Sequence, residues 1–251
     1  MPSFSHLHCH SQFSLLDGAS PIDDMFAKAK ADGMRAVALT DHGNMFGAFK
    51  FVNSGLKHGV KPIVGCEFYM VEDRTRRSFV GDTRDKRFHQ LILAKNQKGY
   101  ENLSLLCSIG FMEGMYGKFP RIDKAVLKRH SEGLIATSCC IGAEIPQAIL
   151  FKGEEEAEII LKEYINIFGE DFYIELQRHG IQNIDGTGMS QEDVNQVLIS
   201  FAKKYNLKII ATNDSHYMEE DDALPHDILL CVNTGSRITD PKGYGKGMRF
   251  A

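Results

Sequence analysis

The sequence lacks any long apolar run, which excludes a membrane-spanning helix. No stretch approaches the roughly 18 apolar residues that a span requires. The first residues, up to Phe13, are mostly polar and include His6, His8 and His10, so they do not provide the apolar core of a signal peptide. We therefore expect a cytoplasmic protein without a membrane partner.

Paired cysteines and an excess of positive charge are also missing. The six cysteines form no C-x-x-C pair and no compact framework, so we expect them to be reduced core residues or metal ligands. The net charge of −4 gives no bulk attraction for nucleic acid. Any contact with DNA would depend on a local site or on attached domains. There is no internal repeat, low-complexity segment or G-x-S-x-G motif of a serine hydrolase.

The 251 residues, 43% of them hydrophobic and 25% charged, have the composition of one large globular domain. Seven apolar segments have strand character, at residues 4–10, 36–42, 61–70, 87–94, 133–140, 171–179 and 207–216. Helical patterns lie between many of them, at residues 21–33, 44–59, 97–116, 154–168 and 190–205. We expect Ser20 to cap the first of these helices, since Pro21 follows it.

The alternation of strands and helices predicts an α/β fold with parallel strands and right-handed crossovers. Seven such units favour a distorted seven-stranded (β/α)7 TIM-like barrel over an open sheet. The tail from 235 to 251 contains Gly243, Gly245 and Gly247. It follows no predicted strand and opens no predicted helix, which favours a flexible end over a phosphate-binding loop.

Candidate ligands occur at the carboxyl end of every predicted strand, which is where barrel-like α/β proteins place their active sites. Alternate residues of a strand share a face, so His8 and His10 can point together. Read alone, each residue has a simpler explanation: a hydrogen-bonded structural histidine, a salt-bridged Glu67 or a small core Cys140. Independent accidents would scatter between both ends of the strands. The candidates are His8, His10, Asp17, Asp41, His42, Glu67, His89, Cys139, Cys140, Arg178, His179, Asp214 and His216.

Mixed imidazole and carboxylate ligands suit Zn, Mn or Fe better than Ca or Mg. The ligands are too many for one tetrahedral ion, so we expect about two or three divalent metal ions. Asp17 and Glu67 are natural bridging carboxylates between such ions. Ions of this kind would lower the pKa of a bound water to about 7 and so provide hydroxide as a nucleophile at neutral pH.

Four short motifs resemble those of PHP domains, a family named after polymerases and histidinol phosphatase. They are the HxH of residues 8–10, Thr40-Asp41-His42-Gly43, Gly65-Cys66-Glu67-Phe68 and Asn213-Asp214-Ser215-His216. Residues 6–18, 61–69, 93–103 and 211–217 also resemble the start of the bacterial replicative C-family DNA polymerases, the DNA polymerase III alpha subunits. The resemblance covers the whole chain. It implies an amino-terminal PHP domain at residues 1–234, followed by a tail, 235–251, that leads to the polymerase part.

The resemblance also implies roles for individual residues. Asp17, Glu67 and Asp214 would be catalytic as metal-bridging or water-orienting carboxylates. Asp41 would orient a ligand histidine from behind, and Arg178 and His179 would contact substrate. Cys140 stands where relatives that are not polymerases tend to have histidine. The implied metal ligands are His8, His10, Asp17, His42, Glu67, His89, Cys140, Asp214 and His216.

The loop after the third predicted strand offers a second source of phosphate contacts. It carries Arg74, Arg76, Arg77, Arg84, Lys86 and Arg87. Asp73, Asp82 and Asp85 interrupt this run, which favours a solvated mixture of charges over a phosphate site.

The resemblance therefore implies part of a DNA-directed DNA polymerase, a nucleotidyltransferase. The expected activity of the domain itself is that of a metal-dependent phosphoesterase, a proofreading 3′–5′ exonuclease. The expected partners are the primer 3′ end of DNA, the remaining polymerase domains in cis, and replisome subunits that include the sliding clamp and a separate proofreading exonuclease subunit. One alternative is a catalytically silent, metal-stabilised scaffold that docks the polymerase body or that exonuclease subunit. The other is a small-molecule phosphatase of the histidinol-phosphatase type.

Overall fold

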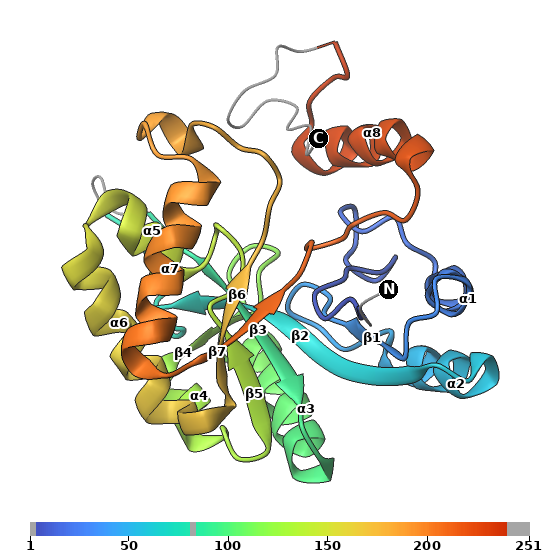
Figure 1. Cartoon of the computed structure of the whole chain (residues 1–251), viewed down its shortest axis with the longest axis horizontal. Helices are drawn as coiled ribbons and strands as arrows, with labels where there is room; N and C mark the ends of the chain where they lie inside the picture. The colour runs from blue at the N-terminus through green and yellow to red at the C-terminus, as the bar shows by residue number, and fades with distance from the viewer. Residues whose placement is uncertain (1–3, 81–83, 240–251) are drawn as a thin grey trace. The chain divides into compact units, whose positions relative to one another are not determined.

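The computed structural model describes residues 4–80 and 84–239, and these form two compact units (Figure 1). The first unit comprises Met1–Asp41, Phe46–Val64 and Asn213–Ala251. The second comprises His42–Met45 and Gly65–Thr212. The strand β2 (Lys61–Val71) begins in the first unit and ends in the second. The glycines of the predicted tail, Gly243, Gly245 and Gly247, lie outside the described residues.

The first unit packs two helices against a short parallel pair of strands. Strand β1 (Ala36–Leu39) runs parallel to the start of β2, with Ala36 opposite Lys61. Helices α1 (Ile22–Ala31) and α2 (Ala48–His58) meet through Phe26 and Phe51, whose ring centroids are 4.5 Å apart. The buried core of this unit consists of Cys9, Ile22, Met25, Phe26, Ala29, Val37, Leu39, Phe51 and Val60.

Local chemistry explains where these helices begin and end. Helix α1 follows Pro21, whose missing N–H is not needed in the first helical turn. The prediction that Ser20 caps this helix is wrong, because Ser20 lies one residue before the N-cap, Pro21. Ser20 is buried, and its carbonyl accepts a hydrogen bond from the Gln12 amide. Helix α2 ends at Gly59, which adopts the left-handed conformation that glycine tolerates best. After the η3 turn (Glu220–Asp222), helix α8 (Ala223–Thr234) completes the unit.

The second unit contains the remaining strands. Its strand order is β2-β3-β5-β6-β7, with β4 (Arg121–Asp123) beside β2. The other bounds are β3 Phe88–Ala94, β5 Leu134–Thr137, β6 Phe172–Leu176 and β7 Lys208–Ala211. The helices are α3 (Gln97–Met112), α4 (Lys124–Arg129), α5 (Glu144–Phe151), α6 (Glu154–Phe168) and α7 (Gln191–Tyr205). The η1 turn (Gly169–Asp171) precedes β6, and the η2 turn (Ile184–Gly186) lies in the loop before α7. Figure 1 shows α5, α6 and α7 grouped beside these strands.

The prediction of seven strands in an α/β fold is confirmed, but the strands differ in two ways. The segment 4–10 forms only an isolated bridge between Cys9 and Ser215, and β4 is the strand that was not predicted. The prediction of parallel strands is wrong for β3, which is antiparallel to both β2 and β5. Since the connection from β2 to β3 contains no helix among its described residues, it returns the chain antiparallel without a crossover.

The described helices also differ from the expected set. Helix α6 has the predicted bounds, whereas α4, α5 and α8 were not predicted. Among the residues that the structure describes, none of the helices combines the length and the apolar character needed to cross a membrane.

A carboxylate on α6 links this helix to α7 and makes stability depend on pH. Lys204 Nζ lies 2.7 Å from Glu158 Oε1, Tyr205 donates to the same oxygen, and Lys162 forms an ion pair with it. These contacts, that of Lys204 first, lower the pKa of Glu158 from 4.5 to about 2. A depressed pKa stabilises the folded state above the unfolded-state value, and the contribution is lost as pH falls through the folded-state value.

We therefore expect Glu158→Gln to lower the free energy of unfolding at pH 7. The difference from the unchanged chain should shrink as pH falls from 4.5 toward about 2. Urea unfolding at several pH values measures this difference. Glu155→Gln, an exposed change on the same helix, is the control and should have little effect. A Glu158→Gln difference that is constant across this pH range would contradict the assignment.

Candidate metal centre

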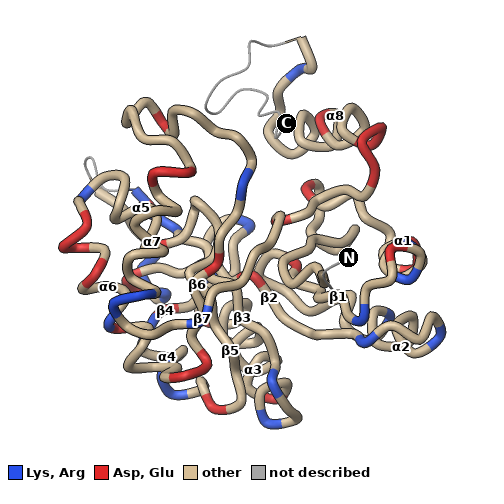
Figure 2. Tube along the Cα trace, in the orientation of Figure 1, with Lys and Arg blue, Asp and Glu red and all other residues tan. Residues whose placement is uncertain are grey.

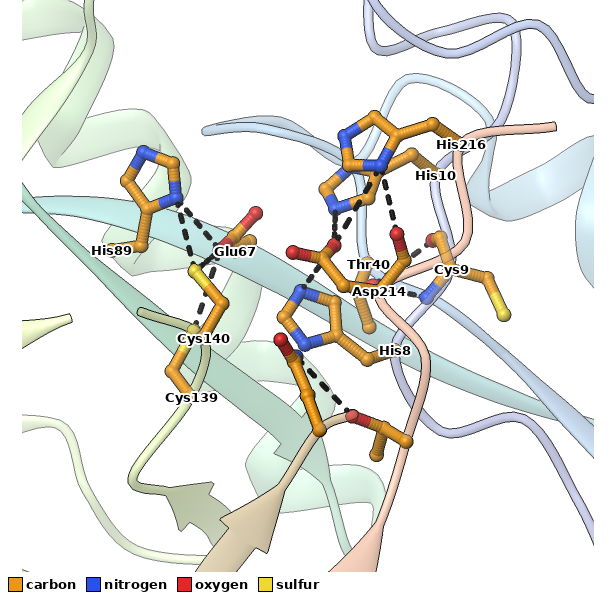
Figure 3. Close-up of polar contacts among 12 residues, drawn as sticks. His8, Cys9, His10, Thr40, Glu67, His89, Cys139, Cys140, Asp214 and His216 are labelled. Carbon is orange, nitrogen blue, oxygen red and sulfur yellow. Dashed lines mark hydrogen bonds and ion pairs between the residues drawn. The ribbon is translucent and has the colours of Figure 1, made fainter. Parts of the chain in front are cut away.

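In the first unit, Asp214 lies at the centre of a group of histidines (Figure 3). Its Oδ1 atom is 3.1 Å from the Nε2 atoms of both His8 and His10. The two histidines are completely buried. The ring of His216 stacks on that of His10 at 4.1 Å, and its Nδ1 is 3.8 Å from the same Asp214 oxygen. Figure 3 shows these four side chains turned toward one another.

Backbone hydrogen bonds hold the two segments of this group side by side. The Ser215 amide donates to the His8 carbonyl at 3.1 Å, and the His10 amide donates to the Ser215 carbonyl at 2.8 Å. Asp214 adopts the left-handed conformation, with φ of 51°, which is uncommon for a residue that has a Cβ. Strain of this kind persists where the surrounding structure imposes it, often at functional sites. His8 and His10 thus point together as predicted, although they lie outside a regular strand.

Asp17 joins the same group from a tight turn. Its Oδ2 atom lies 3.4 Å from His216 Nε2. The turn closes through hydrogen bonds from the Asp17 and Gly18 amides to the Ser14 carbonyl. A Cβ on Gly18 would lie 2.1 Å from the Ser11 carbonyl oxygen, so only glycine fits there. His226, on α8, supports this group from behind: its Nε2 bonds the Asp17 carbonyl at 2.8 Å, and its ring centroid lies 5.8 Å from that of His216.

A buried hydrogen-bond relay fixes the orientation of His10. Ser14 donates its hydroxyl hydrogen to Asp41 Oδ1 at 2.8 Å, since a carboxylate can only accept. The Ser14 oxygen therefore accepts from His10 Nδ1 at 2.9 Å. When the ring is neutral, this tautomer leaves a lone pair on His10 Nε2, the atom that faces Asp214. Asp41 was predicted to orient a ligand histidine, and in this geometry it reaches His10 through Ser14.

In the second unit, Glu67 is the corresponding central carboxylate. It is completely buried on β2. His42 Nδ1 lies 2.9 Å from its Oε2 atom, and His89 Nδ1 lies 3.0 Å from its Oε1 atom. The thiols of Cys139 and Cys140 lie 3.3 Å and 3.6 Å from the same Oε1.

Burial and charge shift the pKa values in this group. Burial alone lowers the pKa of His89, but the charges of Glu67 and Cys140 outweigh it and raise the pKa well above its ordinary value. A hydrogen bond from Cys139 lowers the pKa of Cys140, while burial raises that of Cys139 itself. The Cys140 thiol thus ionises more readily than an ordinary thiol, and the Cys139 thiol ionises less readily. A thiolate is the form that binds metal.

A second buried network positions the two cysteines. Glu175 accepts hydrogen bonds from Thr137 and Thr212, both at 2.5 Å. Thr137 Oγ1 in turn accepts from the Cys139 amide at 3.0 Å. This bond holds Cys139 in a left-handed conformation, with φ of 57°. The turn that carries Cys139 and Cys140 is therefore tied through Thr137 to Glu175 on β6, which Thr212 bonds in turn.

Both groups have the donor types that transition metals prefer. Ligand atoms that lie within 4.8 Å of one another are provided by His8, His10 and Asp214 in the first unit. The second unit provides His42, Glu67 and His89, and also Glu67, Cys139 and Cys140, at the same spacing. Imidazole, carboxylate and thiol donors fit Zn or Fe, and the thiol-free group fits Mn as well. The sharing of ions by all nine predicted ligands stays a prediction from the sequence.

The predicted substrate residues follow β6 and contact the start of α7. The Arg178 side chain is 81% exposed and pairs with Glu192 on α7. The His179 amide donates to Gln191 at 2.6 Å, at the start of the loop before α7. In the basic loop, Arg74 pairs with Glu113 and Asp123, in agreement with the mixture of charges that the sequence favoured.

Sequence reasoning missed three residues that organise the two groups. Ser14, Glu175 and Arg121 are all buried. Arg121 pairs with Asp85 at 2.6 Å and donates to three backbone carbonyls, which fixes the loop after β2. A glutamate within the apolar strand segment 172–176 was a signal for Glu175, while nothing in the sequence marked Ser14.

Comparison with known proteins agrees with the resemblance seen in the motifs. A family model described as the PHP domain matches residues 6–179. The chain is 45% identical over 237 residues to DNA polymerase III subunit alpha of Borreliella burgdorferi, covering 94% of this chain and 20% of that protein. It is 45% identical over 244 residues to that subunit of Thermus aquaticus, covering 96% and 19%. The chain therefore spans about a fifth of the length of these curated relatives.

Solved structures show the same fold at low sequence identity. A protein from Bifidobacterium adolescentis that is assigned as a metal-dependent phosphoesterase has a TM-score of 0.54 and 13% identity, covering 86% of this chain and 88% of that one. An amidohydrolase from Chromobacterium violaceum has a TM-score of 0.52 and 17% identity, covering 86% and 89%. The likeness confirms the predicted fold class, an α/β fold of the PHP type that is consistent with a distorted TIM-like barrel.

The relay through Ser14 predicts a measurable loss of metal affinity. We expect Ser14→Ala to weaken zinc binding by about 10- to 100-fold, because His10 loses the bond that fixes its tautomer. Competition with a chromophoric chelator measures the affinity of the metal-stripped chain. Ser200→Ala, at an exposed position on α7, is the control and should bind zinc like the unchanged chain. Equal affinities for all three chains would rule out the relay.

The two cysteines beside Glu67 predict metal-dependent thiol chemistry. In the chelator-treated chain, iodoacetamide should modify Cys140, whose pKa is lowered, and added zinc should protect it. Cys9 should resist modification in both states, since burial raises its pKa to about 12. Partly exposed Cys231 serves as an internal control for the reagent. Mass spectrometry of the peptides measures each site, and equal modification of Cys140 with and without zinc would argue against its role as a ligand.

Proposed function

We propose that this chain, which belongs to the PHP domain family, is the amino-terminal PHP domain of a bacterial DNA polymerase III alpha subunit. We also propose that it hydrolyses phosphodiester bonds with divalent metal ions. The relatives whose names give the first part of this proposal are about five times longer than the chain. Nucleotide addition is therefore proposed for the remaining polymerase domains, which would act in cis. The cytoplasmic location stays a prediction from the sequence.

One observation supports the hydrolytic activity above the others. Each unit holds a carboxylate, with Glu67 fully buried and Asp214 buried at its Oδ1 atom, against two imidazole nitrogens at 2.9–3.1 Å. Burying a charge costs several kcal/mol unless a partner compensates it, so such groups need a reason to persist. Two sets of converging lone-pair donors around buried carboxylates are what divalent ions require.

The side chains would divide the work of holding ions. His8, His10, Asp17, Asp214 and His216 would bind metal in the first unit, and His42, Glu67, His89 and Cys140 in the second. Bound Zn, Mn or Fe would supply Lewis acidity and lower the pKa of water to about 7. Ser14 and Asp41 keep His10 in one tautomer, and Glu175 with Thr137 holds the cysteine turn in place. These hydrogen bonds orient the donors before any ion or substrate arrives, which avoids reorganisation during the reaction.

The proposed substrate is the 3′ end of a DNA primer, and the proposed reaction is proofreading in the 3′–5′ direction. The relatives are named as a DNA polymerase subunit, which makes DNA the substrate available to this domain. A structural neighbour is assigned as a metal-dependent phosphoesterase, which favours phosphoester chemistry for the fold. The sliding clamp and a separate exonuclease subunit remain proposed partners of the longer protein.

We expect the chain to shorten a DNA hairpin with a mismatched 3′ end in the presence of Mn or Zn. Asp214→Asn should lower the rate by about 100-fold or more, because it removes the carboxylate that three histidines approach. Denaturing gel electrophoresis measures the products. Asp24→Asn, an exposed change on α1, is the matched control and should keep the full rate.

A second candidate function is a metal-stabilised scaffold without catalysis. It is favoured by the thiol pair beside Glu67, since thiol-rich sites are typical of structural zinc. On this view, zinc raises the melting temperature while hairpin DNA stays intact at every metal concentration. That result would overturn the hydrolytic proposal.

A small-molecule phosphatase is the third candidate, and release of phosphate from histidinol phosphate but not from DNA would identify it.

A further inference from the structure

A tight turn in the second unit presents a lysine between two aromatic rings. The amides of Tyr116 and Phe119 each donate to the carbonyl of the other residue at 3.1 Å. Gly117 takes the left-handed conformation that the turn requires, with φ of 59°. Lys118 is exposed at the tip of the turn. The turn precedes β4 and has no role in the ligand groups.

Aromatic contacts extend from this turn in two directions. The Phe119 ring lies 5.0 Å from that of Tyr69, edge to face, and the Tyr116 ring lies 5.2 Å from that of Phe79. Tyr69 also contacts the candidate ligands of this unit, with centroid distances of 5.8 Å to His42 and 5.7 Å to His89. Tyr69 thus connects Phe119 of the turn to the histidines beside Glu67, while Phe79 of the loop after β2 pairs with Tyr116 of the same turn.

Cationic side chains lie over the outer rings of this series. The Arg87 guanidinium is 3.7 Å from the Phe119 centroid, and the Lys118 ammonium is 5.7 Å from it. The Arg76 guanidinium is 4.8 Å from the Phe79 centroid. We call these six residues the basic–aromatic surface: Arg76, Phe79, Arg87, Tyr116, Lys118 and Phe119.

The charge around this surface differs from that of the whole chain. In the sequence, Lys and Arg outnumber Asp and Glu by six to four in residues 72–88 and equal them at two each in residues 113–123, whereas the chain has a net charge of −4. Asp85 pairs with Arg87 but also with buried Arg121, so these three residues together stay cationic. Figure 2 shows positive and negative residues interspersed over the rest of this unit. A polyanion would therefore find its local attraction at the basic–aromatic surface.

We propose that the basic–aromatic surface binds a single strand of nucleic acid and directs its end toward His42 and His89. This proposal rests on the proposed function of the site, for which it identifies the strand-binding surface. Alternating cations and aromatic rings are the features that bind single strands, because phosphates pair with the cations and unpaired bases stack on the rings. Phe119 occupies the central position, since it contacts Tyr69 on one side and the two cations on the other.

The chemistry favours a single strand over a duplex. In a duplex the base faces are already stacked, so the rings would gain nothing from contact with them. Stacking also tolerates any base, because every base has a flat π-face. A nuclease that acts on mismatched ends of any sequence needs this tolerance.

The test measures binding of fluorescein-labelled oligo(dT) to the chain in chelator, where hydrolysis cannot occur. We expect Phe119→Ala to weaken binding by between about 5-fold and about 100-fold, the range for loss of one stacked base. Phe119→Tyr keeps the ring and should bind like the unchanged chain. Lys118→Glu should weaken binding and reduce the slope of log affinity against log salt by about 0.7, the effect of one lost phosphate contact on a single strand.

Lys128→Glu is the matched control for charge, since Lys128 is exposed on α4, which contributes nothing to the surface. It should bind oligo(dT) like the unchanged chain. The proposal is overturned if the unchanged chain does not bind oligo(dT) at low salt, if Lys118→Glu and Lys128→Glu behave alike, or if a duplex binds as tightly as the single strand. Lys118→Glu and Phe119→Tyr keep the test valid should Phe119→Ala fail to fold.

Hydrolysis of a chromogenic phosphodiester by the unchanged chain with Mn separates this proposal from the proposed function. Binding of oligo(dT) that depends on Phe119 without any hydrolysis would leave the surface standing and remove the phosphoesterase. Hydrolysis of the diester together with full oligo(dT) binding by Phe119→Ala would remove the strand-binding surface and leave the phosphoesterase standing.

Discussion

The structure depends on two carboxylates placed among nitrogen and sulfur donors: Glu67, which is fully buried, and Asp214, whose Oδ1 atom is buried. An isolated buried carboxylate would lose several kcal/mol of hydration, and pairing with protonated imidazoles recovers only part of it. The ring tautomer that Ser14 imposes makes His10 a donor of a lone pair toward Asp214 when the ring is neutral. The lone pair on His10 Nε2 and a lone pair on Asp214 Oδ1 repel, since the two atoms face each other at 3.1 Å. A cation between the two atoms removes this repulsion. Metal binding is thus the state that reconciles the burial with the hydrogen bonding.

This constraint explains where the backbone is strained. Asp214 and Cys139 both adopt left-handed conformations. Asp214 carries the central carboxylate of the first group, and Cys139 brings its thiol to Glu67 in the second. Such conformations cost about 1–3 kcal/mol at a residue other than glycine. Hydrogen bonds from neighbouring segments offset the strain: Ser215 bonds His8 and His10, and Thr137 holds the Cys139 amide. Hydrogen bonds of the fold therefore help to maintain the ligand geometry.

The sequence predicted the elements that are defined by local composition and missed those defined by long-range contacts. Continuous apolar runs identified β2 and β3, but their antiparallel pairing depends on a loop that no pattern of residues marks as helix-free. The first segment failed as a strand because its backbone hydrogen bonds to other segments form only one isolated bridge, at Cys9, and no regular ladder. The ligand residues were predictable because their type and their place after strands are visible in the sequence. Ser14 was not, since a serine gains its role only from what it touches in the folded chain. Glu175 was marked only by its place in an apolar strand, and its bond to Thr137 became visible in the folded chain.

A net negative charge is not an obstacle to handling DNA when the attraction is local. Bulk positive charge would hold any polyanion, duplex or single strand, and would compete with the release of a correctly paired primer. A surface that combines a few cations with Phe79, Tyr116 and Phe119 favours unpaired bases instead, because only they expose faces to stack. Unpairing costs least at a mismatched end. Discrimination between a mismatched and a matched end can thus arise from the strand's own stability, before any ligand at Glu67 meets a phosphate.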